Sequence, residues 1–458
     1  MTLQGNSRAV FVFTIMAVLL LIVGYFQSWN VMLSILNLCI ISAIMALGVN
    51  IQWGYAGLFN VGIMGFAALG GVAALLVSKP PVPTAWAAGG LGILGAGVLT
   101  AMVAAAIWFI VKRMRSGGTK NAVIFIVALG GYFLIRSVYD PAVNAIEADN
   151  PASSGYLGGL GLPIIFSWFV GGLFAAGIAW FIGKVALGLR SDYLAIATLG
   201  ISEILIATMK NEDWLTRGVK NVTGLDRPVP YELQLQESEV FAGWVEWFFS
   251  SRLEGLTGDA RTTVLRDAVI EGSSLFVKLC YTGLFTAVLL AVLALCVLAL
   301  ASPWGRMVRA IRDNEVSAAA MGKNVTRRHL QIFILGSAVV GIAGAMLTTL
   351  DGQFTPSTYQ PLRYTFLIWV MVIVGGSGNN LGAVFGGFLI WFIWIEAEPV
   401  GNWFMGVVTQ GMEDGSWLRT HLLDSAQHMR LIIMGAVMLL VMRFSPGGVL
   451  PERQQSQA

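Results

Sequence analysis

Charged residues are scarce in this chain of 458 residues: they make up 12% of it, whereas hydrophobic residues make up 56%. An ordinary soluble domain carries about 25% charged residues, so the composition excludes a typical soluble globular protein. The mean hydropathy is +0.75. Repeated apolar runs approach the roughly 20 residues that cross a bilayer as a helix, and no alternating ten-residue pattern indicates a barrel. The sequence therefore predicts an all-α, polytopic membrane protein.

Residues that do chemistry are also few. The three cysteines lie in apolar runs without disulfide or metal-ligand spacing, and the three histidines lie near the ends of runs or in loops. The sequence contains no G-x-x-x-x-G-K-[ST] phosphate loop, and "GGSGN" at 375–379 departs from the G-x-S-x-G nucleophile pattern. We therefore expect no catalytic residue, no metal site and no cofactor bound by this chain.

Twelve apolar runs are candidate spans, and because several are short we expect about 10–12 transmembrane helices. The first run follows a single basic residue and lacks a small-x-small cleavage pattern, which favours a retained span over a signal peptide. The runs are 9–27, 31–50, 55–77, 86–111, 121–138, 162–182, 193–209, 274–301, 330–350, 364–378, 380–396 and 429–443.

The loops differ in charge, and this difference predicts the orientation. Loops 112–120 and 183–190 are basic, whereas 140–150 contains acids and no Lys or Arg. Basic loops lie on the cytoplasmic side. With this assignment every span alternates sides, both termini are cytoplasmic, and segment 211–272 lies in the periplasm.

Within that outer segment, one short stretch is amphipathic. Phe241, Trp244, Val245 and Phe248 fall at i, i+3, i+4 and i+7, which is one apolar face of a helix too short to span a membrane. We expect an interfacial helix at the outer membrane surface rather than a small soluble core.

Ionisable residues inside spans are costly, so each is a candidate for function. Glu203 is the clearest, although a structural hydrogen bond to a neighbouring helix would explain it equally well. Arg136 and Glu396 lie near predicted span ends, where reaching to water explains them more simply. This shortage of buried acids argues against a proton-coupled carrier.

Two glycine clusters, at 54–62 and 375–382, interrupt apolar sequence. A broken helix, which makes backbone dipoles available at membrane depth, would have this pattern. A tight loop with close helix packing is the alternative interpretation. The candidate residues of a substrate pathway are Gly54, Tyr55, Gly57, Asn60, Gly62, Glu203, Gly375 and Gly378.

The stretch 302–329 is basic and amphipathic between two apolar runs. Its first part has an apolar stripe and an opposite charged face. The stripe consists of Trp304, Met307, Val308 and Ile311, and the charged face of Arg306, Arg309, Arg312 and Asp313.

Asn314 is a suitable N-cap for a second short helix, which Gly322 would end. The pattern predicts two short helices that meet at a corner. Such a corner is either an interfacial loop that carries positive-inside charge or an element that docks into a partner's groove.

This stretch also carries a family resemblance. The segment "GRMVRAIRDNEVSAAAMGKNV" (305–325) resembles the cytoplasmic loop of permease subunits of ABC importers for branched-chain amino acids and related substrates. Three further segments resemble the same family in the same order, and together the matches cover about three quarters of the chain. They are "LGVNIQWGYAGLFNVGIMGFAALGG" (47–71), "LRSDYLAIATLGISEI" (189–204) and "VGGSGNNLGAVFGG" (374–387).

The resemblance implies a single permease domain over 1–458, in the bacterial inner membrane, of the longer of two permease types. It also implies the partners: a homologous second permease, two ATP-binding subunits that use ATP and Mg, and a periplasmic substrate-binding protein. Residues 302–329 would then be the cytoplasmic coupling loop. The implied coupling residues are Gly305, Arg306, Arg309, Ala310, Ile311, Arg312, Asp313, Asn314, Glu315, Ala319 and Gly322.

The resemblance favours import of branched-chain or other hydrophobic amino acids by alternating access. Import of urea or short amides is the alternative within the family, and an ion-coupled secondary transporter or a membrane scaffold is the alternative outside it. Two features depart from the family pattern. Asn60 stands where serine is common, and the insertion 232–272 lies beyond the usual length.

Overall fold

The structure is a computed structural model that describes residues 3–150, 155–254, 257–413 and 416–452. Its described residues are mostly helical, and the only strands among them are β1 (Val222–Thr223) and β2 (Gln353–Phe354). The long helices are α1 (Leu3–Phe26), α2 (Trp29–Val49), α5 (Leu91–Arg113), α6 (Gly118–Ala148), α7 (Ile165–Ala186), α8 (Ser191–Asn211), α13 (Asp259–Ala301), α16 (Val325–Asp351) and α18 (Asn380–Val408).

Shorter apolar helices and connecting turns complete the described chain. The shorter apolar helices are α3 (Ile63–Ser78), α17 (Pro361–Gly375) and α20 (Met429–Phe444). The connecting helices are α4 (Pro83–Ala85), α9 (Asp213–Thr216), α10 (Glu232–Gln236), α11 (Glu239–Phe248), α12 (Ser250–Leu253), α14 (Pro303–Asp313), α15 (Glu315–Ala320) and α19 (Trp417–Asp424). The described chain also has two π-helical turns, η1 (Asn50–Gly54) and η2 (Trp86–Gly90), and two 3-10 helical turns, η3 (Pro356–Thr358) and η4 (Ser425–His428).

Each of the twelve predicted spans contains one apolar helix, which confirms the all-helical membrane fold. Within the described ranges, nine helices are long and apolar enough to cross a membrane, or ten if the bent pair α19 and α20 counts as one span. The helices α3 and α17 are shorter, because the chain breaks before Ile63 and turns after Gly375.

The helices pack around α16, which contacts α2, α3 and α7. Small residues allow this close approach. A Cβ atom on Gly344 would overlap the backbone of Ala67 in α3, and one on Gly341 would meet the backbone of Gly171 in α7. The centre of the molecule is therefore a body of helices in backbone contact.

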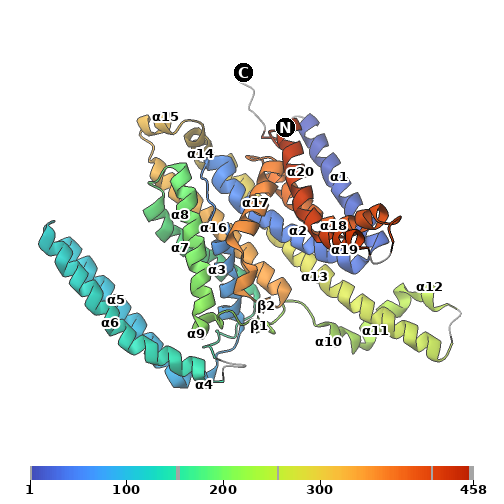
Figure 1. Ribbon diagram of the computed structural model, residues 1–458, viewed down its shortest axis with the longest axis horizontal. Helices are drawn as coiled ribbons and strands as arrows, with labels where there is room; N and C mark the ends of the chain where they lie inside the picture. The colour runs from blue at the N-terminus through green and yellow to red at the C-terminus, as the bar shows by residue number, and fades with distance from the viewer. Residues whose placement is uncertain (1–2, 151–154, 255–256, 414–415, 453–458) are drawn as a thin grey trace.

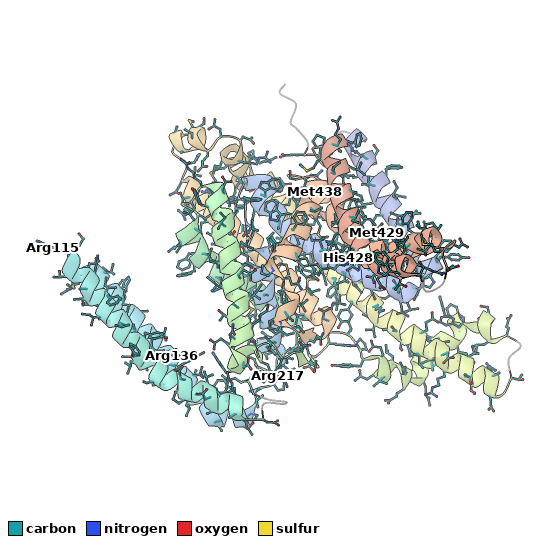
Figure 2. The ribbon with its side chains drawn as sticks, in the orientation of Figure 1. Arg115, Arg136, Arg217, His428, Met429 and Met438 are labelled. Carbon is teal, nitrogen blue, oxygen red and sulfur yellow. The ribbon has the colours of Figure 1, made fainter. Side chains whose placement is uncertain are left out.

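The hairpin of α5 and α6 differs, because it extends away from this body (Figure 1). Only 6% of the most apolar segment of each helix is buried. Arg115 lies at the far tip of the hairpin, and Arg136 lies partway along it (Figure 2). The base of the hairpin is held by Glu212, whose carboxylate accepts hydrogen bonds from Tyr139 Oη and Trp214 Nε1.

The two ends of the bundle differ in what they carry. The start of α1, the end of α20 and the pair α14–α15 lie at one end, and β1, β2, α9 and α10 lie at the other (Figure 1). The two strands pair antiparallel, with Val222 opposite Phe354, and so join the segment after α9 to the end of α16. The side of the membrane that each end faces stays a prediction from the loop charges.

Two expectations from the sequence change, for Glu396 and for α11. Glu396 does not reach water from a span end: α18 continues to Val408, and the Glu396 side chain is buried and accepts a hydrogen bond of 2.6 Å from Gln27 Nε2. The apolar face of α11 is divided. Phe241 and Val245 pack on α13, whereas Trp244 and Phe248 are 63% and 72% exposed.

Candidate functional site

The first glycine cluster is a broken helix. Regular α-helix ends at Val49, the chain continues as the wider helical turn η1, and after the irregular residues 57–62 the next helix, α3, begins at Ile63. Gly57 lies in this break with φ of +70°, a conformation that disfavours residues with a Cβ atom. Wider π-type turns frequently mark functional positions inside helices. The broken-helix interpretation therefore holds for this cluster.

The second cluster is a tight turn between α17 and α18. Gly376 and Gly378 have φ of +118° and +78°, which only glycine adopts readily. Asn379 then caps α18 by accepting the backbone N–H of Leu381 at 3.0 Å. Here the tight-loop interpretation describes the structure.

The structure brings the two clusters together through Asn50. Its side-chain oxygen accepts the backbone N–H of Gly378 at 2.9 Å, and its side-chain nitrogen donates to Asn380 Oδ1 at 3.2 Å. A Cβ atom on Gly54 would meet the Gly378 backbone nitrogen at 2.5 Å, so only glycine fits there. We call this meeting of residues 50–54 with 378–380 the glycine junction.

Arg312 connects the basic stretch to the glycine junction. Its Nη1 donates to the backbone oxygen of Gly54 and to the Glu452 carboxylate, the latter at 2.9 Å. Burial opposes the charge, but the hydrogen bond and ion pair with Glu452 raise the pKa of the Arg312 guanidinium, which stays charged. The side chain is 24% exposed. Arg312 therefore joins α14 to the broken helix and to the segment after α20.

The two short helices form as the sequence predicts. Ser302 caps α14, whose first residue is Pro303, and Asn314 caps α15 by accepting the Ser317 backbone N–H at 2.9 Å. Gly322 follows α15 with φ of +75°. These caps satisfy backbone donors that a short polar helix would otherwise leave unpaired.

The apolar stripe of α14 packs against this chain itself. Val308 and Ile311 are 1% and 2% exposed, and Ile311 packs with Ala318 and Val325. The exposed apolar residues of the corner are instead Val316 and Met321, at 80% and 79%. The exposed apolar surface of the corner therefore lies on α15 and the turn that follows it.

The remaining coupling candidates divide by exposure. Arg309 donates to the Leu300 backbone oxygen at 3.1 Å, and a Cβ atom on buried Gly305 would meet the backbone of the same residue. These two residues fix α14 against the end of α13. The exposed candidates are Arg306, Ala310, Asp313, Asn314, Glu315, Ala319 and Gly322.

A second polar cluster lines the broken segment. Gln52 Nε2 donates to the Phe333 backbone oxygen at 3.0 Å and to Ser337 Oγ at 3.1 Å, while its side-chain oxygen accepts from Asn60 Nδ2 at 2.9 Å. The Asn60 backbone oxygen accepts from Trp369 Nε1 at 3.1 Å. Asn60 thus fixes the path of the break against α16 and α17.

The sequence candidates missed several members of the site: Asn50, Gln52, Asn380 and Glu452. The polar residues Asn50 and Gln52 next to the first glycines were an available signal, because unpaired polar groups are costly in a membrane. Glu452 carried no comparable signal. It reaches Arg312 only because the chain after α20 returns to the glycine junction, where Leu450 N donates to the Gly375 backbone oxygen at 2.9 Å.

Glu203 lies apart from these residues. It is on the exposed side of α8, and its neighbour Ser202 is the one that faces the body, where a Cβ atom on Gly65 would meet it at 2.8 Å. Tyr55 is buried beside the glycine junction, and Gly62 lies against the backbone of Thr198. The candidates of the first cluster thus lie in one region, and Glu203 does not.

Comparisons with known proteins identify the family of this chain. A family model described as "Branched-chain amino acid transport system / permease component" matches residues 31–140 and 114–442. The chain belongs to this family. Membership and the apolar helices make it a multi-pass membrane protein, and the bacterial inner membrane is where such a permease lies. No solved structure matched the chain.

The similar proteins include two permeases named for branched-chain amino acids. The permease protein LivM of a "High-affinity branched-chain amino acid transport system" from Escherichia coli (strain K12) is 26% identical over 284 residues, which is 62% of this chain and 56% of LivM. The probable branched-chain amino acid permease LivM of Methanocaldococcus jannaschii is 23% identical over 75% of this chain and 83% of its own length.

A sugar permease is also similar. The xylose transport system permease XylH of E. coli (strain K12) is 30% identical over 33% of this chain and 41% of its own length. The chain therefore shares part of its sequence with permeases of different substrates, and it spans little more than half of the length of the E. coli LivM that it matches.

Proposed function

We propose that this chain is the transmembrane permease subunit of an ATP-driven importer of branched-chain or other hydrophobic amino acids. The hydrogen bond from Arg312 to the broken helix at Gly54 is the observation that supports it most directly. In this proposal a separate ATP-binding subunit contacts the exposed face of α14 and α15. Its closure moves Arg312, and the break at 54–62 then changes the access of the pathway.

The domain assignment forms part of the proposal. Residues 1–458 make one permease domain, 302–329 is its cytoplasmic coupling loop, and 211–272 is its periplasmic segment. The partners are a homologous permease, two ATP-binding subunits and a periplasmic binding protein. ATP and Mg are used in the partner subunits, because the sequence of this chain has no phosphate loop.

Copurification and uptake test the proposal together. We expect the tagged chain, expressed with the ATP-binding subunits and second permease of its own genome, to copurify with them. In proteoliposomes with the binding protein, the complex should take up leucine only when ATP is present. The control is a complex in which the phosphate-loop lysine of the ATP-binding subunits is replaced. This complex should not take up leucine.

An ion-coupled carrier would give the opposite result. Uptake that follows a proton or sodium gradient without ATP, or failure of the ATP-binding subunits to copurify, would contradict the proposal. Urea and xylose are included as substrates, because preferential uptake of either would replace the amino-acid assignment.

A further inference from the structure

A cavity of 240 Å³ lies inside the helical body, between α2, α3, α16, α17 and α18. Its walls are mainly apolar, and its polar groups are few. Pockets of this character are the usual sites for small ligands. The cavity includes none of the glycine-junction residues, so it is a separate feature of the molecule.

The inner wall of the cavity fits an aliphatic side chain. Met45, Met64 and Met371 come from three different helices and are all at least nine-tenths buried. Methionine is flexible and polarizable, so it adapts to branched apolar groups of different shape. Leu367 and Ile368 extend the same apolar surface.

One rim of the cavity favours a cation. Asp351 is the last residue of α16, and its exposed side chain lines the cavity. The C-terminal end of a helix carries partial negative charge, which adds to that of the carboxylate. Thr358 and Tyr364 line the cavity as well, and their hydroxyl groups can donate hydrogen bonds. This rim lies near β2, at the end of the bundle opposite α14 (Figure 1).

A second observation points to a polar ligand. Trp391 lines the cavity, and its indole N–H is buried without an acceptor among the described residues. A buried donor without a partner costs about 1–3 kcal/mol, so such groups call for an explanation. A ligand with an acceptor group next to its apolar part would satisfy this donor.

We propose that this cavity binds the amino acid during its passage through the permease. The ammonium group lies at Asp351, and the aliphatic side chain lies among the methionines. The carboxylate accepts hydrogen bonds from the hydroxyl groups of the rim and from Trp391 Nε1. This assignment rests on the proposed function and deepens it by naming the site that selects an aliphatic zwitterion.

Uptake by the reconstituted complex tests the assignment, with leucine and phenylalanine as the probes. Asp351→Asn removes the charge but keeps the shape, and we expect leucine uptake to fall about ten-fold, because a hydrogen bond to a charged group contributes roughly that much. Glu237→Gln removes an exposed carboxylate at the same end of the bundle and is the matched control, with uptake like that of the parent.

Met371→Ala tests the side-chain position by enlarging the cavity. The ratio of phenylalanine to leucine uptake should rise about three-fold, since a changed apolar contact shifts preference by that order. The ratio does not depend on how much folded complex is present. The binding protein is the same for every variant, so a changed ratio belongs to the permease.

The outcomes separate the two proposals. A parent complex that fails to transport leucine contradicts the proposed function itself. If the parent transports leucine, parental uptake in Asp351→Asn or an unchanged ratio in Met371→Ala overturns the cavity assignment and leaves the importer function standing.

Discussion

Two equally apolar regions of this molecule differ in what surrounds them. In the central helix α16, 56% of the most apolar segment is buried, whereas in α5 and α6 the value is 6%. Both regions satisfy the length and composition of a membrane span. Apolar sequence therefore predicts that a helix enters the membrane, but it does not predict whether lipid or protein covers it.

The glycines explain part of the difference. In α16, Gly336, Gly341 and Gly344 each lie where a Cβ atom would overlap a neighbouring helix. In the hairpin, Gly92 and Gly131 meet side chains of the facing helix, whereas Gly97 and Gly130 have no described atom of another helix within 4 Å of where a Cβ atom would be. Glycines thus bring helix backbones into contact in the central body, whereas in the hairpin they meet side chains of the facing helix or lie at open positions.

We expect the greatest loss of stability from a substitution at a closely packed glycine of α16. Gly344→Val should destabilise the body by about 3 kcal/mol, because the added side chain meets the Ala67 backbone and cannot be accommodated by a side-chain rotation. The measurement is the yield of monodisperse protein after detergent extraction and its thermal stability.

The matched control is Gly130→Val in the hairpin, which should extract and melt like the parent because its site is open. Equal losses in the two variants would show that the hairpin is as closely packed as the body and would contradict the comparison.

An intermediate effect is expected at Arg312, which joins the coupling loop to the body. Arg312→Glu places a carboxylate beside Glu452 and leaves the Gly54 backbone oxygen without its donor. We expect the complex to assemble, but substrate should no longer stimulate its ATP hydrolysis. Uptake should fall about ten-fold or more. ATPase activity with and without loaded binding protein measures this.

Two further variants serve as a control and as a rescue for Arg312→Glu. Arg306→Glu changes an exposed arginine of the same helix and should retain more activity. Adding Glu452→Arg to Arg312→Glu restores an opposite pair and should recover part of the uptake. If substrate stimulates ATP hydrolysis in the Arg312→Glu complex as strongly as in the parent complex, Arg312 has no coupling role.

We expect the smallest effect on α8, which has one face buried against the body and one exposed face. Glu203 lies on the exposed face, so Glu203→Gln should change uptake by less than about two-fold, as is usual for exposed substitutions. Uptake kinetics, normalised to assembled complex, provide the measurement. A large loss of uptake in Glu203→Gln would indicate that Glu203 belongs to the substrate pathway. It would also show that this face of α8 contacts something other than lipid.

Much of the fold could be predicted locally. Apolar runs located the twelve long or apolar helices of the described residues. The caps Asn314 and Gly322 located the corner at α14–α15, because capping acts within a few residues of sequence. The site was predicted only in part. Gly54 and Gly378 were identified as members of separate clusters, but their contact through Asn50 joins positions more than 300 residues apart.

The membrane environment, the helices and the two-helix corner follow from the sequence, since hydropathy, length and capping are properties of neighbouring residues. Helix packing determines which glycines touch, that Arg312 donates hydrogen bonds to Gly54 and Glu452, and that Asp351 and Met371 line one cavity. The physical reason is distance along the chain: these contacts depend on how helices pack, and packing depends on many weak contacts that no short segment contains.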